Sequence, residues 1–240
     1  MARGDVLLVG SVPLADAEAV FTACGHALGD HLASLPDGET GDRRIWIVYQ
    51  AYRVFDGHPQ LETVRRPRGL ADEPWIPAGL DDLWQFKVRP GAGPLHFETL
   101  RYADDAIASY TRFQALRAAG GLPAGLRFQV CLPTPVGVCG VFFPDLATRP
   151  AVEAAYADAM GRELDRLCAA VPGSDLAVQW DVCTELMEIE GVFPAPGDPW
   201  QRYEQALGAL LGRVPADALL GYHFCYADLG HRHMVEPKDL

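Results

Sequence analysis

The stretch Leu176-Ala177-Val178-Gln179-Trp180-Asp181 decides the fold, because five mainly apolar residues run directly into a carboxylate. A short apolar run bounded by turns is typical of a strand that is buried in a parallel sheet. Further runs of this kind are expected to form strands at about residues 5–10, 31–36, 83–88, 126–132 and 219–225. The sequence therefore predicts strands spread along the whole chain.

Helical patterns fill the intervals between these strands. Apolar residues recur at helical spacing over residues 103–113 and again over residues 152–167. Thr148 is the expected N-cap of the second of these helices. Segment 57–80 is rich in Pro and Arg and is expected to be a long loop. Alternating strands and helices predict an α/β fold, in which helices cover a parallel sheet.

Polar and turn-rich residues follow the expected strands. In parallel α/β folds the reactive residues gather at the carboxyl ends of the strands. Here these ends include Gly10-Ser11, Asp37-Gly38-Glu39, Asp181, and His223 with Cys225. This pattern favours a TIM-type (β/α) barrel with its site on one rim.

We expect a single barrel domain over residues 1–240, but the chain is short for a complete barrel. About six βα units are visible at roughly 43 residues each, whereas eight such units would need roughly 340 residues. The barrel is therefore expected to be incomplete, with its C-terminal units missing. A second chain, a shortened chain or an unusual open barrel would each account for this.

Composition and charge narrow the classes of partner. The chain has 32 acidic and 20 basic residues, which gives a net charge of −12. Such a charge repels nucleic acid, and the basic stretches are too short to offset it. The apolar runs are too short to cross a bilayer or to act as a signal peptide. We therefore expect a cytoplasmic protein with neither a membrane nor a nucleic acid as partner.

His223-Phe224-Cys225 is the sharpest local feature. Residues two apart on a strand point to the same face, so the imidazole and the thiolate could converge on one metal ion. Zinc accepts both types of ligand. The alternative is structural, with Cys225 packed among apolar side chains and His223 hydrogen-bonded. Two ligands also fall short of the three protein ligands that a catalytic zinc needs.

Two carboxylates are candidates for substrate binding. Asp181 ends an apolar strand, where it could bind an ammonium group or act as an acid or base, or else cap the turn that follows. Cys183 and Glu185 follow at a spacing of two and share its expected direction. Glu39 lies between Gly38 and Gly41, in a tight turn that presents it at the rim or serves only as an acidic turn.

Other polar residues give weaker signals. Gly10-Ser11 could offer backbone N–H groups and a hydroxyl to an anion, or could form a simple turn. Arg43, Arg44 and Trp46 are expected to open a helix, on which an arginine could bind a carboxylate. The pair His231-x-His233 lies in an expected loop and is a further metal or acid–base candidate.

No phosphate-binding loop, dinucleotide fingerprint, nucleophile elbow or H-E-x-x-H motif occurs in the sequence. Five short motifs, taken in order, instead resemble the catalytic barrel of cobalamin-independent methionine synthase, in the superfamily that also contains uroporphyrinogen decarboxylase. These motifs are Val9-Gly10-Ser11-Val12-Pro13, Gly38-Glu39, Leu132-Pro133-Thr134-Pro135-Val136, Gln179-Trp180-Asp181 and His223-Phe224-Cys225-Tyr226. They extend over residues 9–226, nearly the whole chain.

The resemblance implies a fold, an activity and a set of roles. It implies a zinc-dependent methyltransferase in which a homocysteine-like thiol, activated by the metal, attacks a methyl donor, and a folate-type donor is one candidate. Gly10 and Ser11 would hold the substrate carboxylate, Glu39 and Asp181 its amino group, and Cys225 with His223 the zinc. In that family a glutamate and a cysteine from later strands complete the zinc site.

Two other hypotheses stay open from the sequence. The same barrel could work without metal as a decarboxylase or lyase, with Asp181 and the arginines as the working groups. Alternatively, an incomplete barrel could be non-catalytic and bind a partner, including a second copy of the chain, through its exposed sheet edges.

Overall fold

A computed structural model describes residues 6–68, 75–227 and 232–237. Its main feature is a parallel sheet in the order β1 (Ser34–Pro36), β4 (Arg127–Pro133), β5 (Leu176–Val182) and β6 (Leu219–Phe224). The strands predicted at 126–132, 176–181 and 219–225 are confirmed, and the one at 31–36 is shorter than predicted. The mixed α/β fold predicted from the sequence is therefore observed.

The N-terminal segment extends the sheet beyond β1. Val6 bridges to Leu32 and Ser11 bridges to Gly38, both in the parallel sense. The predicted strand at 5–10 is thus reduced to one isolated bridge at Val6, with a second at Ser11 just beyond it, and residue 5 lies outside the described residues. Within the part of the chain that the structure describes, nothing pairs with the free edge of β6, so the sheet is open and does not close into a barrel.

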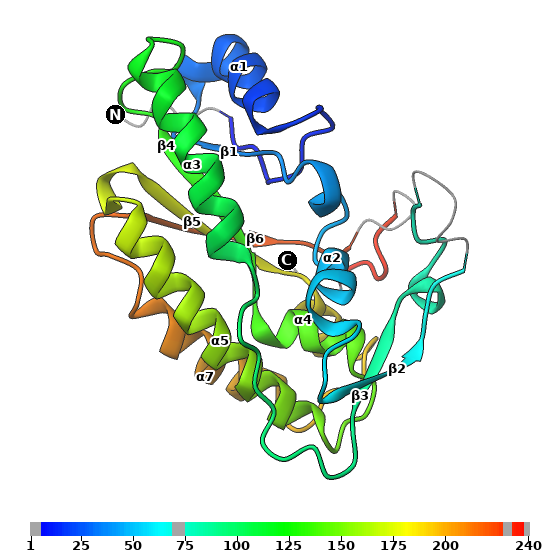
Figure 1. Ribbon diagram of the computed structural model, residues 1–240. Coiled ribbons are helices and arrows are strands. Elements are labelled where there is room, and N and C mark those ends of the chain that lie inside the picture. Colours follow the sequence, from blue (N-terminus) through cyan, green and yellow to red (C-terminus); the bar gives the residue numbers. More distant parts are fainter. Residues whose placement is uncertain (1–5, 69–74, 228–231, 238–240) are drawn as a thin grey trace.

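A row of helices covers one face of this sheet (Figure 1). The row runs from α1 (Ala17–Leu28) to α3 (Tyr102–Ala118), α5 (Arg149–Ala170) and α7 (Pro199–Leu211), each in contact with the next. Each of these helices lies in the interval that precedes or follows a strand of the sheet, as in βα units. Three shorter helices lie near the strand ends: α2 (Val48–Gln50), α4 (Pro135–Phe142) and α6 (Thr184–Ile189).

The helices predicted at 103–113 and 152–167 lie inside α3 and α5 and are confirmed. Thr148 occupies the N-cap position of α5, but its hydroxyl donates to the Asp145 carboxylate instead of capping the helix. The helix predicted to open at Arg43 is also displaced. A 3₁₀ turn, Gly41–Arg43, comes first, and α2 begins only at Val48.

One predicted strand belongs to a different sheet. Strand β3 (Gln85–Val88) pairs antiparallel with β2 (Leu61–Arg65), so placing 83–88 in the parallel sheet was wrong. The long loop predicted over 57–80 was also wrong in part, because it contains β2. The sequence of β3 gives the physical reason, since buried Phe86 alternates with polar Gln85 and exposed Lys87. Such alternation is typical of an antiparallel strand buried on one side.

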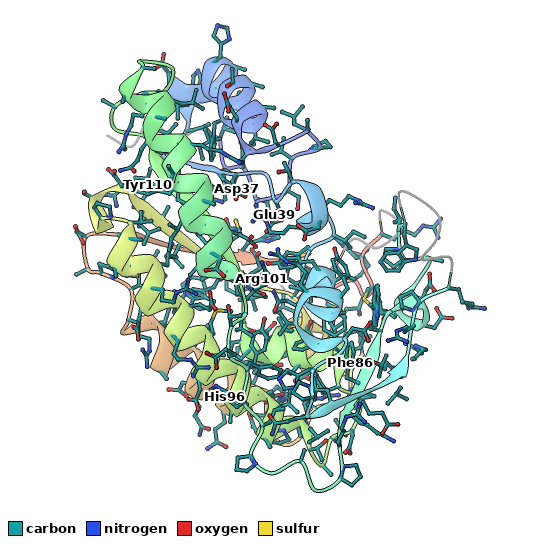
Figure 2. All side chains as sticks on the ribbon, in the orientation of Figure 1. Asp37, Glu39, Phe86, His96, Arg101 and Tyr110 are labelled. Carbon is teal, nitrogen blue, oxygen red and sulfur yellow. The ribbon has the colours of Figure 1, made fainter. Side chains whose placement is uncertain are left out.

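Two groups of aromatic side chains form much of the core. Phe21, Phe113 and Phe128 join α1, α3 and β4 through edge-on and tilted ring contacts. Phe55 and Phe86 lie in the second group, which packs the β2–β3 pair against α4 and α5. Figure 2 shows Phe86 at a distance from Asp37 and Glu39. The small antiparallel sheet therefore covers one end of the molecule. The carboxyl ends of the parallel strands stay available to form the site.

No helix among the described residues is both long and apolar enough to span a membrane.

Candidate active site

The register of β5 and β6 brings the site residues together. Asp181 pairs with His223 and Val182 pairs with Phe224. Paired residues on adjacent parallel strands point to the same face, so Asp181 and His223 lie together and the next such pair is Cys183 and Cys225. The backbone N–H of Cys225 donates to the Val182 carbonyl at 3.1 Å and extends this pairing beyond the strands.

Asp181 is the most completely bonded side chain of the site. It is 4% exposed and accepts hydrogen bonds from Gln179 Nε2 at 2.8 Å and from the Trp46 indole N–H at 2.9 Å. His223 Nδ1 lies 3.2 Å from Asp181 Oδ1, the oxygen that also accepts from Gln179, whereas Trp46 donates to Oδ2. Donors on three sides therefore fix a buried carboxylate at the carboxyl end of β5.

His223 and Cys225 form a charged pair beside Asp181. Hydrogen bonds to Asp181 and then to Cys225 raise the pKa of the His223 imidazole to about 10. Hydrogen bonds from Cys183 and then from His223 lower the pKa of the Cys225 thiol to about 5. At neutral pH the pair is therefore an imidazolium and a thiolate, the form in which sulfur is a nucleophile or a metal ligand.

Cys183 lies next to this thiolate and stays protonated. Its hydrogen bond to Cys225, followed by burial, raises its pKa above the usual range. The Ala227 backbone N–H also donates to Cys225 Sγ at 3.2 Å. The negative charge on Cys225 is thus held by donors from three different residues.

Glu39 and Ser11 form the other half of the site. Ser11 Oγ donates to Glu39 Oε2 at 2.5 Å, and the isolated bridge between Ser11 and Gly38 aligns the two segments. Burial, opposed by the Ser11 hydrogen bond and reinforced by the nearby charge of Asp181, raises the pKa of Glu39 to about 7. A Cβ on Gly10 would lie 3.2 Å from Cys131 Sγ and 3.4 Å from Glu39 Oε2, so a glycine there allows this close packing.

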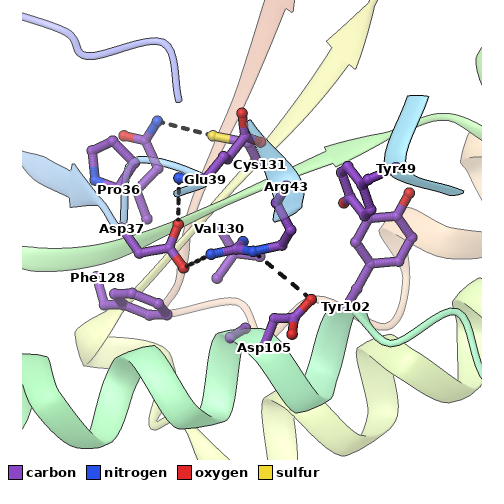
Figure 3. A pocket seen from close by; sticks show the side chains of 12 residues that line it. Pro36, Asp37, Glu39, Arg43, Tyr49, Tyr102, Asp105, Phe128, Val130 and Cys131 are labelled. Atoms are coloured by element: carbon purple, nitrogen blue, oxygen red, sulfur yellow. Dashed lines mark hydrogen bonds and ion pairs between the residues drawn. The ribbon is translucent and has the colours of Figure 1, made fainter. Parts of the chain in front are cut away.

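A small polar cavity lies behind Glu39 (Figure 3). Its volume is about 20 Å³, room for about one water molecule. Arg43 donates to Asp37 Oδ2 at 2.6 Å and lies 3.8 Å from Asp105 Oδ2, while the Glu39 backbone N–H donates to Asp37 Oδ1 at 3.0 Å. The ion pairs around this cavity fix the turn that carries Glu39. The cavity itself is too small for an organic substrate.

A larger apolar pocket of about 180 Å³ opens beside the thiols. Cys183 and Cys225 line it together with Trp46, whose indole binds Asp181. The rest of its wall is mainly aliphatic, from Ile45, Ile47, Val48, Pro77, Leu80, Leu83, Val141, Met187, Phe193 and Met234, among others. An apolar pocket with a few polar groups at one side is the usual form of a small-molecule site.

Backbone strain is concentrated at the same place. Among the described residues, four non-glycine residues have positive φ, and three of them belong to the site: Glu39 at 49°, Ile47 at 46° and Ala227 at 60°. Positive φ is especially unfavourable for a β-branched side chain such as that of Ile47. Residues held in such conformations cluster at functional sites, where surrounding contacts fix them.

The predicted site residues are therefore brought together. Contacts link Ser11 to Glu39 and link Asp181 through His223 to Cys225, and the charges of Glu39 and Asp181 influence each other. His233 is not part of this group, since its ring contacts Glu236 and Tyr226, and His231 lies outside the described residues.

The zinc prediction needs at least three ligands in one place. Across residues 6–68, 75–227 and 232–237, no group of three or more His, Cys, Asp and Glu side chains could hold a metal ion. The described residues thus bring together the two predicted ligands, His223 and Cys225, without completing a zinc site. No catalytic step is assigned to a metal here.

Sequence reasoning missed several partners of these residues. Trp46 was considered only as part of a helix, although it donates directly to Asp181 from 135 positions away in the chain. Glu185 was expected to share the direction of Asp181, but it is fully buried, contacts Thr134 and accepts from the Cys183 backbone N–H at 3.2 Å. The contacts of Trp46 with Asp181 and of Glu185 with Thr134 do not follow from spacing, because each joins separate elements.

In comparisons with known proteins, no family model, no curated protein and no solved structure matches this chain.

Proposed function

We propose that the chain forms an active site for methyl transfer to the sulfur of a small, homocysteine-like amino acid. The observation that carries this proposal is the convergence of Ser11, Glu39, Asp181, His223 and Cys225 from four separate strand ends. This cluster contains two acidic groups that could bind an amine and a thiol that is acidic for a cysteine, which supports the proposal.

The same proposal includes a (β/α) barrel. The described residues contribute the four strands of the open sheet and the bridged segment at Val6 and Ser11, all parallel and in contact with a row of helices. Strands that closed this sheet would run beside β6 and enclose the face that carries Asp181 and His223. An enclosed site of this kind is the usual arrangement at the carboxyl end of a barrel.

The acidic groups suit a substrate ammonium group. Asp181 is buried and already fixed by three donors, and Glu39 lies close enough to affect it electrostatically. A bound ammonium between the two would favour the charged form of Glu39 and lower its pKa from about 7. Ser11 is exposed and its hydroxyl can turn from Glu39 toward a substrate carboxylate.

The sulfur side of the site suits a thiol substrate. His223 is a cation beside Cys225, so a substrate thiolate that binds there gains an electrostatic partner. Zinc stays a prediction that follows from the resemblance, and metal analysis of the purified chain tests it. If zinc binds, it supplies the acidity that makes a thiol nucleophilic at neutral pH.

Binding and transfer are tested with L-homocysteine, by calorimetry and by mass spectrometry of the product with a panel of methyl donors. Asp181→Asn is expected to weaken homocysteine binding about 100-fold, the loss of roughly one charged hydrogen-bond pair. Asp175→Asn is the matched control, because Asp175 precedes β5 at its other end, where it contacts Tyr110 and Arg117. The proposal is contradicted if homocysteine does not bind in the presence of either added zinc or chelator. It is also contradicted if both variants lose the same amount of homocysteine affinity.

A second function is favoured by the pKa of Glu39, which lies near neutrality. A carboxyl group of this kind is poised for general acid–base catalysis, as a metal-independent decarboxylase or lyase requires. In that case activity persists in chelator and in Cys225→Ser but is lost in Glu39→Gln. Methyl transfer that requires Cys225 contradicts this alternative.

A further inference from the structure

Cys183 and Cys225 are neighbours on adjacent strands and their side chains share one face. They follow directly on β5 and β6, whose last residues, Val182 and Phe224, are paired in register. Neighbouring strands lie about 4.8 Å apart, and a disulfide needs Cα atoms about 4.4–6.8 Å apart. Both side chains also line the same pocket, so no rearrangement of the strands is needed to join the sulfur atoms.

The surroundings give a small reagent access to this pair. Both cysteines line the apolar pocket of about 180 Å³, and Cys225 is the more exposed of the two. The Ala227 backbone N–H donates to Cys225 Sγ at 3.2 Å and fixes this sulfur in place, and the side chain of Cys183 is buried, with 7% exposed. Cys225 is therefore the sulfur that an incoming reagent meets first, and Cys183 is placed behind it.

We propose that Cys225 and Cys183 are a reactive dithiol that a small hydroperoxide converts into a disulfide. Cys225 attacks one peroxide oxygen, which forms an S–O bond and breaks the O–O bond. The sulfenic acid stays on Cys225, and the other peroxide oxygen takes up a proton and leaves as water from hydrogen peroxide or as an alcohol from an organic hydroperoxide. Cys183 then attacks the oxidised sulfur. The S–S bond forms, the S–O bond breaks, and the Cys183 proton leaves with hydroxide as water. The two sulfurs together lose two electrons and the peroxide gains them.

The modification does not depend on the proposed methyl transfer, but it would stop any reaction that needs Cys225. In the disulfide the sulfur carries no charge, so His223 loses one of its two partners. The pocket also loses its two thiols as polar groups. Oxidation would thus switch off the sulfur side of the site while Asp181 and Glu39 stay in place.

The test uses the reduced full chain, freed of metal by a chelator and treated with one equivalent of hydrogen peroxide. We expect the number of free thiols to fall from six to four, the mass to fall by two hydrogens, and non-reducing peptide maps to show a Cys183–Cys225 link. Cys183→Ser is expected to leave a Cys225 sulfenic acid that a cyclic dione traps. Cys225→Ser is expected to slow the reaction about tenfold or more.

Cys131→Ser is the matched control, because Cys131 Sγ donates to the Val9 carbonyl at 3.1 Å and lies on the neighbouring strand β4. It is expected to oxidise like the unchanged chain. A reagent that bridges two thiols without oxidation, phenylarsine oxide, should bind once to the unchanged chain and to Cys131→Ser but to neither single variant of the pair. Three results would overturn the proposal, whatever the outcome of the homocysteine experiment. Other cysteines are oxidised first, the arsenical does not bind, or each chain holds one zinc ion so tightly that both sulfurs are shielded.

Discussion

Strands β5 and β6 lie side by side and carry Asp181 and His223, yet their surroundings are opposite. Every residue of β5 is buried, whereas four of the six residues of β6 are exposed, with Phe224 at 65%. Leu220, Tyr222 and Phe224, which share one face of β6, are 44%, 40% and 65% exposed. Asp181 is therefore held by an enclosed framework, while the position of His223 depends mainly on one neighbouring strand.

The sharpest way to test this difference is a pair of matched truncations. Trp180 and Tyr222 are register partners, but Trp180 is 0% exposed and Tyr222 is 40% exposed. Trp180→Ala is expected to lower the free energy of unfolding by about 3–5 kcal/mol, because it leaves a large cavity. Tyr222→Ala is expected to lower it by less than about 1 kcal/mol. Denaturant unfolding measures both, and similar losses would show that β6 is as enclosed as β5.

The buried carboxyl group of Glu39 also predicts a pH dependence of stability. The pKa of Glu39 is raised from 4.5 to about 7 by burial, so between these values the unfolded chain binds fewer protons at this group than the folded chain. The contribution of Glu39 to stability is thus greatest below about pH 4.5, falls as the pH rises to about 7, and is level above that. The fall is on the order of 3 kcal/mol.

Glu39→Gln should remove this slope, which unfolding measured from pH 4.5 to pH 8 would show. A control is Glu98→Gln, which alters an exposed carboxylate that lies 3.4 Å from His96 Nε2. An unchanged slope in Glu39→Gln contradicts the assignment of a raised pKa to this group.

A third test concerns the contact between the two strands, in which His223 on β6 depends on Asp181 on β5. Asp181→Asn removes its first partner, so the pKa of the imidazole should fall from about 10 by more than one unit. The raised pKa means that His223 stabilises the fold fully below about pH 6.5 and loses this effect as the pH rises through 10. Titration by NMR of the histidine ring measures the change. Cys24→Ser, a change on α1 far from the ring, should leave the titration unaltered.

The smallest effect on stability is expected at the open edge itself. Phe224→Ser should change the free energy of unfolding by no more than about 0.5 kcal/mol, because the side chain is already exposed. The same change should reduce self-association, since uncovered apolar edge strands tend to pair. Light scattering over a range of concentrations compares it with the unchanged chain. Equal association in both would argue against a homo-oligomer formed through β6.

The sequence predicted the parts of the fold that local pattern controls. The strands that contain Leu132, Trp180 and His223 are apolar runs between turns, and they are found where the pattern indicated. The error at 83–88 has the same origin, because a four-residue run such as that around Phe86 does not reveal which strand it will pair with. Pairing is set by packing between distant segments, here the aromatic group around Phe55.

The candidate site was predictable only as a set of residues. The period of a strand placed His223 and Cys225 on one face, and the order of the motifs indicated Glu39 and Asp181. The contacts of Trp46 with Asp181 and of Cys183 with Cys225 depend on strand register and on how α2 packs, which no local spacing encodes. For this reason the thiol pair emerged only from the structure.

The left-handed backbone at Glu39, Ile47 and Ala227 has a consequence for engineering this protein. Substituting Ile47 by glycine would relieve a conformation that costs of order 1–3 kcal/mol, and a screen for heat resistance would therefore select it. Ile47 follows Trp46 directly, however, and a looser turn would free the indole that orients Asp181. Attempts to obtain a more durable variant should begin on the helices remote from the pocket, since any gain at these three positions trades durability against the geometry of the candidate site.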